Sequence, residues 1–315
     1  MVGAPAGGRS GPGRAGTPGP PVRRILVTGG EGQLGLELRR HAWPAGVEIF
    51  APSRAALDLT DPEAARSIAE GGFAAIVNAA AYTAVDRAES EAAAAFAINA
   101  HGAAALADAA RAADIPLVHV STDYVFRGDA AEPYETDAPV DPINVYGASK
   151  AAGEAAVLSG PPRAAVVRTS WVVSAHRSNF VKTMLRLGAQ RDVVRVVDDQ
   201  RGAPTLARDL AEALAVIALR MIDDRDAPAG LFHVTNAGSA TWRDFADAIF
   251  DAARARGAKV PRVEAIATAD YPTPARRPAY GVLSTRRVER EHGVAPLPWR
   301  ERLPALVAEI METSG

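Results

Sequence analysis

A tyrosine and a lysine stand four residues apart in the segment Tyr146-Gly-Ala-Ser-Lys150. On a helix, residues at this spacing share one face, so the two side chains can converge on one bound molecule. A free tyrosine has a pKa of about 10, and a nearby ammonium favours the phenolate, which predicts a pKa shifted toward neutral pH. Such a pair can deliver or take a proton while a hydride moves.

Hydroxyl groups cluster upstream of this pair. The apolar run Leu117–Val120 leads into Ser121-Thr122-Asp123-Tyr124. Side chains at the carboxyl end of a central parallel strand face the crevice in which α/β sheets bind ligands. The Tyr–Lys spacing alone is common by chance, and the Ser-Thr strand end makes the combined pattern more specific.

Glycines at 29, 32 and 35 are spaced three apart in the segment Thr28–Gly35. They follow the apolar run 25–27 and precede an expected helix at 34–41. Glycine permits a tight turn and lets backbone N–H groups approach a pyrophosphate, which a helix N-terminus also attracts. We therefore expect a dinucleotide at this turn.

The end of the second expected strand bears on nucleotide choice. An NAD-selective domain has an acid there, whereas this chain reads Phe50-Ala-Pro-Ser-Arg54. Arg54 could accept the 2′-phosphate of NADPH, or it could be a solvated loop residue. We expect NADPH, with NADH possible, and we expect Asp58 and Leu59 to meet the adenine.

Strands and helices alternate along the first half of the chain. We expect strands at 25–27, 47–50, 74–78, 117–121 and 165–168, and helices at 34–41, 61–70, 91–113 and 146–158. This alternation predicts an α/β fold, a Rossmann-type doubly wound parallel sheet, over residues 23–170.

The second half of the chain has a different pattern. We expect helices at 180–187, 207–221 and 242–255, strands at 193–197 and 231–235, and a Pro-rich loop at 271–278. Residues 171–315 should form mainly a smaller α/β substrate-binding domain, partly interleaved, with some segments returning to the Rossmann domain.

The composition of the chain argues against several kinds of partner and site. The formal charge is −2 in 315 residues, which predicts neither nucleic-acid nor membrane partners. There are no cysteines, which excludes disulfides and thiolate chemistry and fits a reducing, cytoplasmic setting. The six histidines stand far apart, and we predict no metal site. Residues 1–22 are rich in Gly, Pro and Arg and are expected to be a disordered tail; a functional basic arm is the alternative.

In these motifs the chain resembles the extended short-chain dehydrogenase/reductases and, among them, the dTDP-4-dehydrorhamnose reductase family. The resemblance runs from about residue 24 to the C-terminus. It is carried by segments 32–35 (GQLG), 78–86 (NAAAYTAVD), 121–126 (STDYVF), 144–150 (NVYGASK), 168–171 (RTSW), 199–205 (DQRGAPT) and 271–274 (YPTP).

The resemblance implies a reaction and roles for residues. The reaction would be NAD(P)H-dependent reduction of the C4 keto group of a nucleotide sugar. Tyr146 would be the general acid, Lys150 would bind the nicotinamide ribose, and Thr122 would hydrogen-bond the substrate carbonyl. The implied cofactor-binding set is Gly29, Gly32, Gln33, Leu34, Gly35, Arg54, Asp58, Leu59, Ala81, Tyr82, Thr83, Tyr146 and Lys150. The implied substrate-binding set is Val85, Thr122, Asp123 and Trp171, although Trp171 could instead be a core aromatic.

Some positions depart from the pattern of the family, and two other functions remain as alternatives. Some members of the family are dimers joined through magnesium bound by glutamates; Glu37 matches one such position, but the others fall on Gln190 and Arg300. We therefore expect a monomer or weak homodimer without a metal bridge. The rival interpretations are a non-catalytic NADP-binding regulatory subunit of the methionine adenosyltransferase β type and a nucleotide-sugar epimerase or dehydratase. A dehydratase would carry an acidic pair beside the strand-end threonine, where this chain has only Asp123.

Overall fold

The computed structural model describes residues 1–3, 22–61, 63–161 and 163–314. Most of the tail predicted at 1–22, and the proline predicted to lie in the first helical turn at 62, fall outside these ranges. A six-stranded parallel sheet forms the centre of the molecule, in the order β10-β5-β4-β3-β1-β2. Its strands are β1 (Arg23–Thr28), β2 (Val47–Phe50), β3 (Ala75–Asn78), β4 (Leu117–Thr122), β5 (Ala164–Thr169) and β10 (Gly230–His233).

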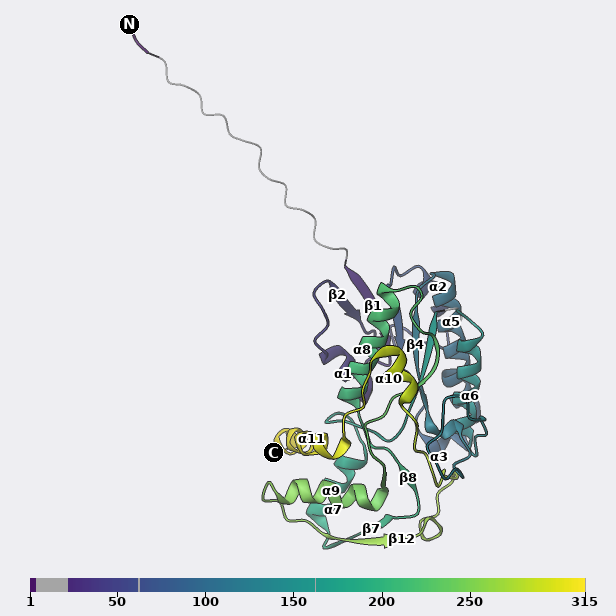
Figure 1. The fold of residues 1–315 in the computed structure, drawn as a ribbon, viewed down its shortest axis with the longest axis vertical. Helices are drawn as coiled ribbons and strands as arrows, with labels where there is room; N and C mark the ends of the chain where they lie inside the picture. Colours follow the sequence, from purple (N-terminus) through teal and green to yellow (C-terminus); the bar gives the residue numbers. More distant parts are fainter. Residues whose placement is uncertain (4–21, 62, 162, 315) are drawn as a thin grey trace.

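Helices cover both faces of this sheet (Figure 1). One face carries α1 (Gln33–Arg40), α8 (Ala207–Asp223) and α10 (Arg286–His292); the other carries α2 (Ala64–Ala69), α5 (Gly102–Ala112) and α6 (Val145–Leu158). The central strands are apolar on both faces, as burial on both sides requires. The predicted doubly wound α/β fold is confirmed.

The helix predicted at 91–113 is not one unbroken α-helix. It consists of α4 (Ala92–Phe96), a π-helical turn at Ala97–His101 and α5. Asn99, in the π turn, explains the break, because its side-chain amide pairs with both backbone groups of Tyr82 and donates to Ser149 Oγ. The prediction missed this feature because π turns have no strong sequence signature.

The second, smaller unit lies below the sheet in Figure 1. It comprises α7 (Phe180–Gln190), α9 (Trp242–Arg254), α11 (Trp299–Ser314) and a parallel pair of strands, β7 (Val193–Val197) and β12 (Arg262–Ile266). Phe245, Ile249 and Trp299 pack in its interior. The sequence did not predict β12, α10 or α11.

Short strands and a returning segment join the two units. The short pairings are β6 (Val172–Val173) with β9 (Thr205–Leu206) and β8 (Arg201–Gly202) with β11 (Ala240–Thr241). The chain returns from the second unit to the sheet through α8 and β10, so the units are interleaved. The Pro-rich stretch 271–278 contains neither helix nor strand, as predicted. The boundary at 170/171 stays a prediction.

Candidate active site

A cleft of about 660 Å³ opens at the carboxyl ends of β1, β3, β4 and β5. The predicted site residues that line it are Gly29, Gly32, Gln33, Leu34, Arg54, Asp58, Leu59, Ala81, Thr83, Val85, Thr122, Asp123, Tyr146, Lys150 and Trp171. Gly35 and Tyr82 do not line it. The fold thus brings most of the predicted residues to one cavity.

Glycines let the backbone of the glycine-rich turn make close contacts with the neighbouring segments. Gly29 has φ +70, and a Cβ there would lie 2.6 Å from Ala80 N at the end of β3. A Cβ on Gly35 would lie 2.1 Å from the Gly29 carbonyl oxygen, so Gly35 allows close packing of α1 on the turn rather than lining the cleft. Gly32 is the N-cap of α1, and no side chain caps it. A side-chain-free helix N-terminus beside glycines fits a dinucleotide pyrophosphate.

Gln33 lines the cleft, but its side chain has protein partners. Its Oε1 accepts hydrogen bonds from Ser174 Oγ and Asn179 Nδ2, both at 3.0 Å. Asn179 Nδ2 also donates to the carbonyl oxygens of Ser174 and His176. Gln33 therefore fastens the loop 174–179 to the first turn of α1.

The end of β2 presents Pro52 and Arg54 to the cleft. The Arg54 side chain is 71% exposed and lies 3.7 Å from an Asp58 carboxylate oxygen. Asp58 accepts hydrogen bonds from Thr60 N and Oγ1, and these bonds hold the pKa of Asp58 below its usual value. Leu59 is buried beside Gly102. Arg54 is therefore an exposed residue of the cleft that is paired with Asp58.

Tyr82 is turned out of the cleft. Its hydroxyl donates to Glu91 Oε2 at 2.6 Å, and this bond raises the pKa of Tyr82. The backbone N–H and carbonyl groups of Tyr82 are both hydrogen-bonded to the side-chain amide of Asn99. Asn99 is thus a residue that sequence reasoning missed, and it links the end of β3 to α6.

Helix α6 brings Tyr146 to the end of β4. Its N-cap, Asn144, accepts a hydrogen bond from Gly147 N at 2.8 Å, a standard start signal for a helix. A Cβ on Gly147 would lie 2.1 Å from the Tyr124 carbonyl oxygen. Only glycine at 147 therefore lets α6 approach closely enough to place Tyr146 and Lys150 in one cleft, as the four-residue spacing predicts.

The predicted lowering of the Tyr146 pKa is wrong. Burial raises the pKa of Tyr146 to about 12, against a smaller lowering effect of hydrogen bonding with Thr122. Lys150 is 2% exposed, its Nζ donates to the Val120 carbonyl oxygen at 2.7 Å, and burial lowers its own pKa to about 8. The phenol is therefore neutral at physiological pH, which is the state that donates a proton.

Asp123 is the one acid beside Thr122. It is buried, and its Oδ1 accepts a hydrogen bond from Thr122 Oγ1 at 3.0 Å. Burial raises the pKa of Asp123 to about 7. Thr122 also accepts a hydrogen bond from Tyr124 N, so the hydroxyl is oriented at the strand end.

The opposite wall is aromatic. Trp171 has a backbone φ of +47, and its ring stacks on Trp242 at a centroid distance of 3.5 Å and an interplanar angle of 8°. A Cβ on Gly202 would lie 2.5 Å from the Trp171 ring. Trp242 was not predicted as a site residue; the capping box of Thr241 and Asp244, which fixes the start of α9, is a signal that could have placed it.

Glu37 lies in a network of charged side chains. Its buried carboxylate lies 3.4 Å from His176 Nε2 and 3.9 Å from Arg208 Nε. Glu309 completes the network through Arg40 and Arg208. Within the described ranges, no group of three His, Asp or Glu side chains is arranged to hold a metal ion. None of the helices described there is long and apolar enough to span a membrane.

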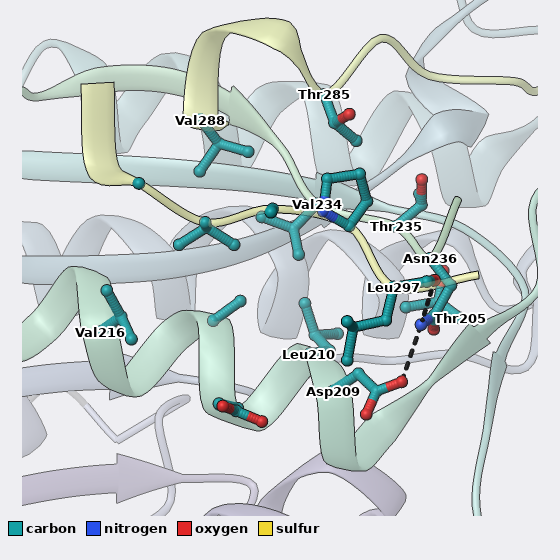
Figure 2. A pocket seen from close by; sticks show the side chains of 16 residues that line it. Thr205, Asp209, Leu210, Val216, Val234, Thr235, Asn236, Thr285, Val288 and Leu297 are labelled. Atoms are coloured by element: carbon teal, nitrogen blue, oxygen red, sulfur yellow. Dashed lines mark hydrogen bonds between the residues drawn. The ribbon is translucent and has the colours of Figure 1, made fainter. Parts of the chain in front are cut away.

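A second cavity of about 190 Å³ lies beside α8 (Figure 2). Its wall combines apolar side chains such as Leu210 and Leu297 with Asp209 and Asn236, which are hydrogen-bonded to each other at 2.7 Å. Arg302 also pairs with Asp209 at 2.8 Å. Asp209 and Asn236 are therefore paired within the protein, and the cavity shares no lining residue with the cleft.

Comparison with known proteins agrees with this site. Residues 23–312 match the family described as the RmlD substrate binding domain. The chain is 44% identical to the dTDP-4-dehydrorhamnose reductase of Sinorhizobium fredii, over 90% of this chain and 96% of the relative. It is 45% identical to the enzyme of that name from Streptomyces griseus, over 91% and 95%.

Solved structures give the same answer. The dTDP-4-dehydrorhamnose reductase of Bacillus anthracis in complex with NADP superposes with a TM-score of 0.84 and 36% identity, covering 91% of this chain and 99% of that one. The orthologue from Clostridium acetobutylicum superposes with a TM-score of 0.85, also at 36% identity, with the same coverage. The chain belongs to the RmlD substrate binding domain family, among relatives named dTDP-4-dehydrorhamnose reductase.

Proposed function

We propose that the protein reduces the C4 keto group of dTDP-4-dehydro-β-L-rhamnose with NAD(P)H, yielding dTDP-L-rhamnose. The observation that carries the proposal is the placement of Tyr146 in one cleft with Thr122, Lys150 and the glycine-rich turn. Relatives that carry the name of this reaction at 44–45% identity, and a relative with bound NADP, support the substrate and the cofactor.

The chain's own residues supply the proton and the positioning. NADPH, when bound, supplies the hydride. Thr122 Oγ1 holds the substrate carbonyl, and the Tyr146 hydroxyl transfers its proton to the developing C4 oxygen. Lys150 would hold the nicotinamide ribose. Leu59 and Asp58 would hold the adenosine end of the cofactor, and Arg54 would bind the 2′-phosphate. Val85, Asp123 and Trp171 contact the nucleotide sugar.

The test is direct. The purified protein is mixed with NADPH and dTDP-4-dehydro-β-L-rhamnose, and nicotinamide absorbance is followed. We expect absorbance to fall in proportion to the dTDP-L-rhamnose formed. NADPH binding without turnover, together with altered kinetics of a partner enzyme, would instead favour a regulatory subunit. Turnover of a nucleotide hexose without net NADPH oxidation would favour an epimerase or dehydratase.

The assembly and the compartment belong to the same proposal. We propose a monomer or weak homodimer in the cytoplasm, held together without metal, because the Glu37 carboxylate already pairs with His176 and Arg208. Sedimentation with magnesium and with a chelator should give the same mass distribution. A mass that halves on chelation would contradict this part.

A further inference from the structure

Arg177 lies at the mouth of the cleft and has no role so far. It lines the cleft together with Glu31, Gly32 and Ser178. Its Nε donates to the Glu31 carbonyl oxygen at 2.6 Å, which places the guanidinium on the glycine-rich turn itself. Neither Nη group has a hydrogen-bond partner within the described part of the chain.

The backbone of Arg177 is strained. Its φ is +55, in the left-handed region that favours glycine and that long side chains rarely adopt. Strain of this kind persists where the surroundings impose it, and it clusters at ligand sites. Here the imposing contacts are those of Gln33 with Ser174 and Asn179, which fasten both sides of the loop to α1.

The place of the guanidinium identifies the part of the ligand that it meets. The N–H groups at the start of α1 attract an anion, and Arg177 adds a full positive charge beside them. In a dinucleotide the group at a glycine-rich turn is the pyrophosphate, whereas Arg54 stands at the end of β2, where the adenosine ribose would lie.

We propose that Arg177 is a cofactor-binding residue that clamps the pyrophosphate of the dinucleotide from above the glycine-rich turn. The inference rests on the proposed function, since it takes NADPH as the ligand. Both NADPH and NADH carry the pyrophosphate, so Arg177 strengthens binding of the two nucleotides equally.

The experiment measures the dissociation constants of NADPH and NADH by nicotinamide fluorescence. Arg177→Asn removes the charge with a residue that tolerates positive φ. We expect it to weaken both nucleotides equally, by about threefold to tenfold, with a smaller loss at high salt because exposed charges are screened. Arg177→Lys, which keeps the charge, should lose less. The melting temperature of Arg177→Asn should not fall, because the strain is relieved.

The outcomes are separable. Unchanged constants in Arg177→Asn overturn the inference, and so does an equal loss in both variants accompanied by a lower melting temperature, which would mark a purely structural role. A loss confined to NADPH also overturns it, since that is the behaviour expected of Arg54→Ala. A wild-type protein that binds neither nucleotide overturns the proposed function together with this inference.

Discussion

The floor and the outer wall of the cleft are built in different ways. The floor consists of strand ends and of α1 and α6, and glycines bring backbone within contact distance, as at Gly35 and Gly147. The wall consists of Trp171, Trp242 and the loop 174–179. Of the three non-glycine residues with positive φ in the described ranges, Trp171 and Arg177 belong to this wall.

This difference separates two tasks. A ladder of buried parallel strands resists displacement, so the floor can hold Tyr146 and Lys150 within proton-transfer geometry. The wall is held instead by side-chain contacts, namely the stacking of Trp171 on Trp242 and the hydrogen bonds of Gln33 to the loop 174–179. We therefore expect changes in the floor to affect turnover or folding, and changes in the wall to affect affinity.

The largest effect should follow from Tyr146→Phe. It removes the proton donor and keeps the ring, so turnover should fall by about 10²–10⁴-fold while NADPH affinity stays within a fewfold. Tyr124→Phe is the matched control, because Tyr124 lines the same cleft with its ring 5.5 Å from that of Tyr146. Steady-state kinetics and NADPH titration measure both. Near-normal turnover in Tyr146→Phe would transfer the role to Asp123 or Tyr124.

Stability of the floor depends on a buried ion pair behind Lys150. Arg168 and Glu154 make two hydrogen bonds, of 2.8 and 2.7 Å, with side chains 1% and 4% exposed. Glu154→Ala leaves a buried guanidinium without its carboxylate, so unfolding free energy should fall by about 3–5 kcal/mol. Chemical denaturation measures it. Asp108→Ala, in an exposed pair with Arg111, is the control and should change little.

In the wall, Trp242→Ala removes the ring on which Trp171 stacks. We expect KM for the nucleotide sugar to rise by about threefold to tenfold, with turnover and NADPH affinity nearly unchanged. Trp242→Phe keeps an aromatic ring in the stack and should recover part of the loss. A fall in turnover with unchanged KM would show that the wall, like the floor, acts in the chemical step.

The smallest effect should come from Arg54→Ala, at the exposed edge of the floor. Exposed charges contribute modestly, so NADPH should bind about two to five times more weakly while NADH is unchanged. Competition between the two nucleotides measures the ratio. An equal loss for both, or none, would show that Arg54 plays no part in nucleotide choice.

Much of the floor could be predicted from the sequence, whereas in the aromatic wall Trp171 was predicted as a substrate-binding residue and Trp242 was not. The three glycines and the Tyr146–Lys150 spacing encode contacts within one turn or helix, where periodicity fixes geometry. Trp242 meets Trp171 only through tertiary packing, and β12, α10 and α11 lack distinctive local signals. The predicted direction of the Tyr146 pKa shift was wrong for a related reason. Burial is a property of the whole fold, and burial is the largest influence on this pKa. The Lys150 ammonium donates to the Val120 carbonyl oxygen.

The π turn at Ala97–His101 makes the length of its segment matter more than its composition. A one-residue insertion rotates everything beyond it by about 100° around the helix axis. That rotation lets Asn99 bond Tyr82 and Ser149 while its carbonyl oxygen lies 2.1 Å from where a Cβ on Gly153 would be. Replacing Ala97 by another helix-forming residue should therefore be tolerated. Deleting Ala97 should rotate α4 relative to α5 away from the present arrangement. Activity should then be lost, although every side chain that lines the cleft remains.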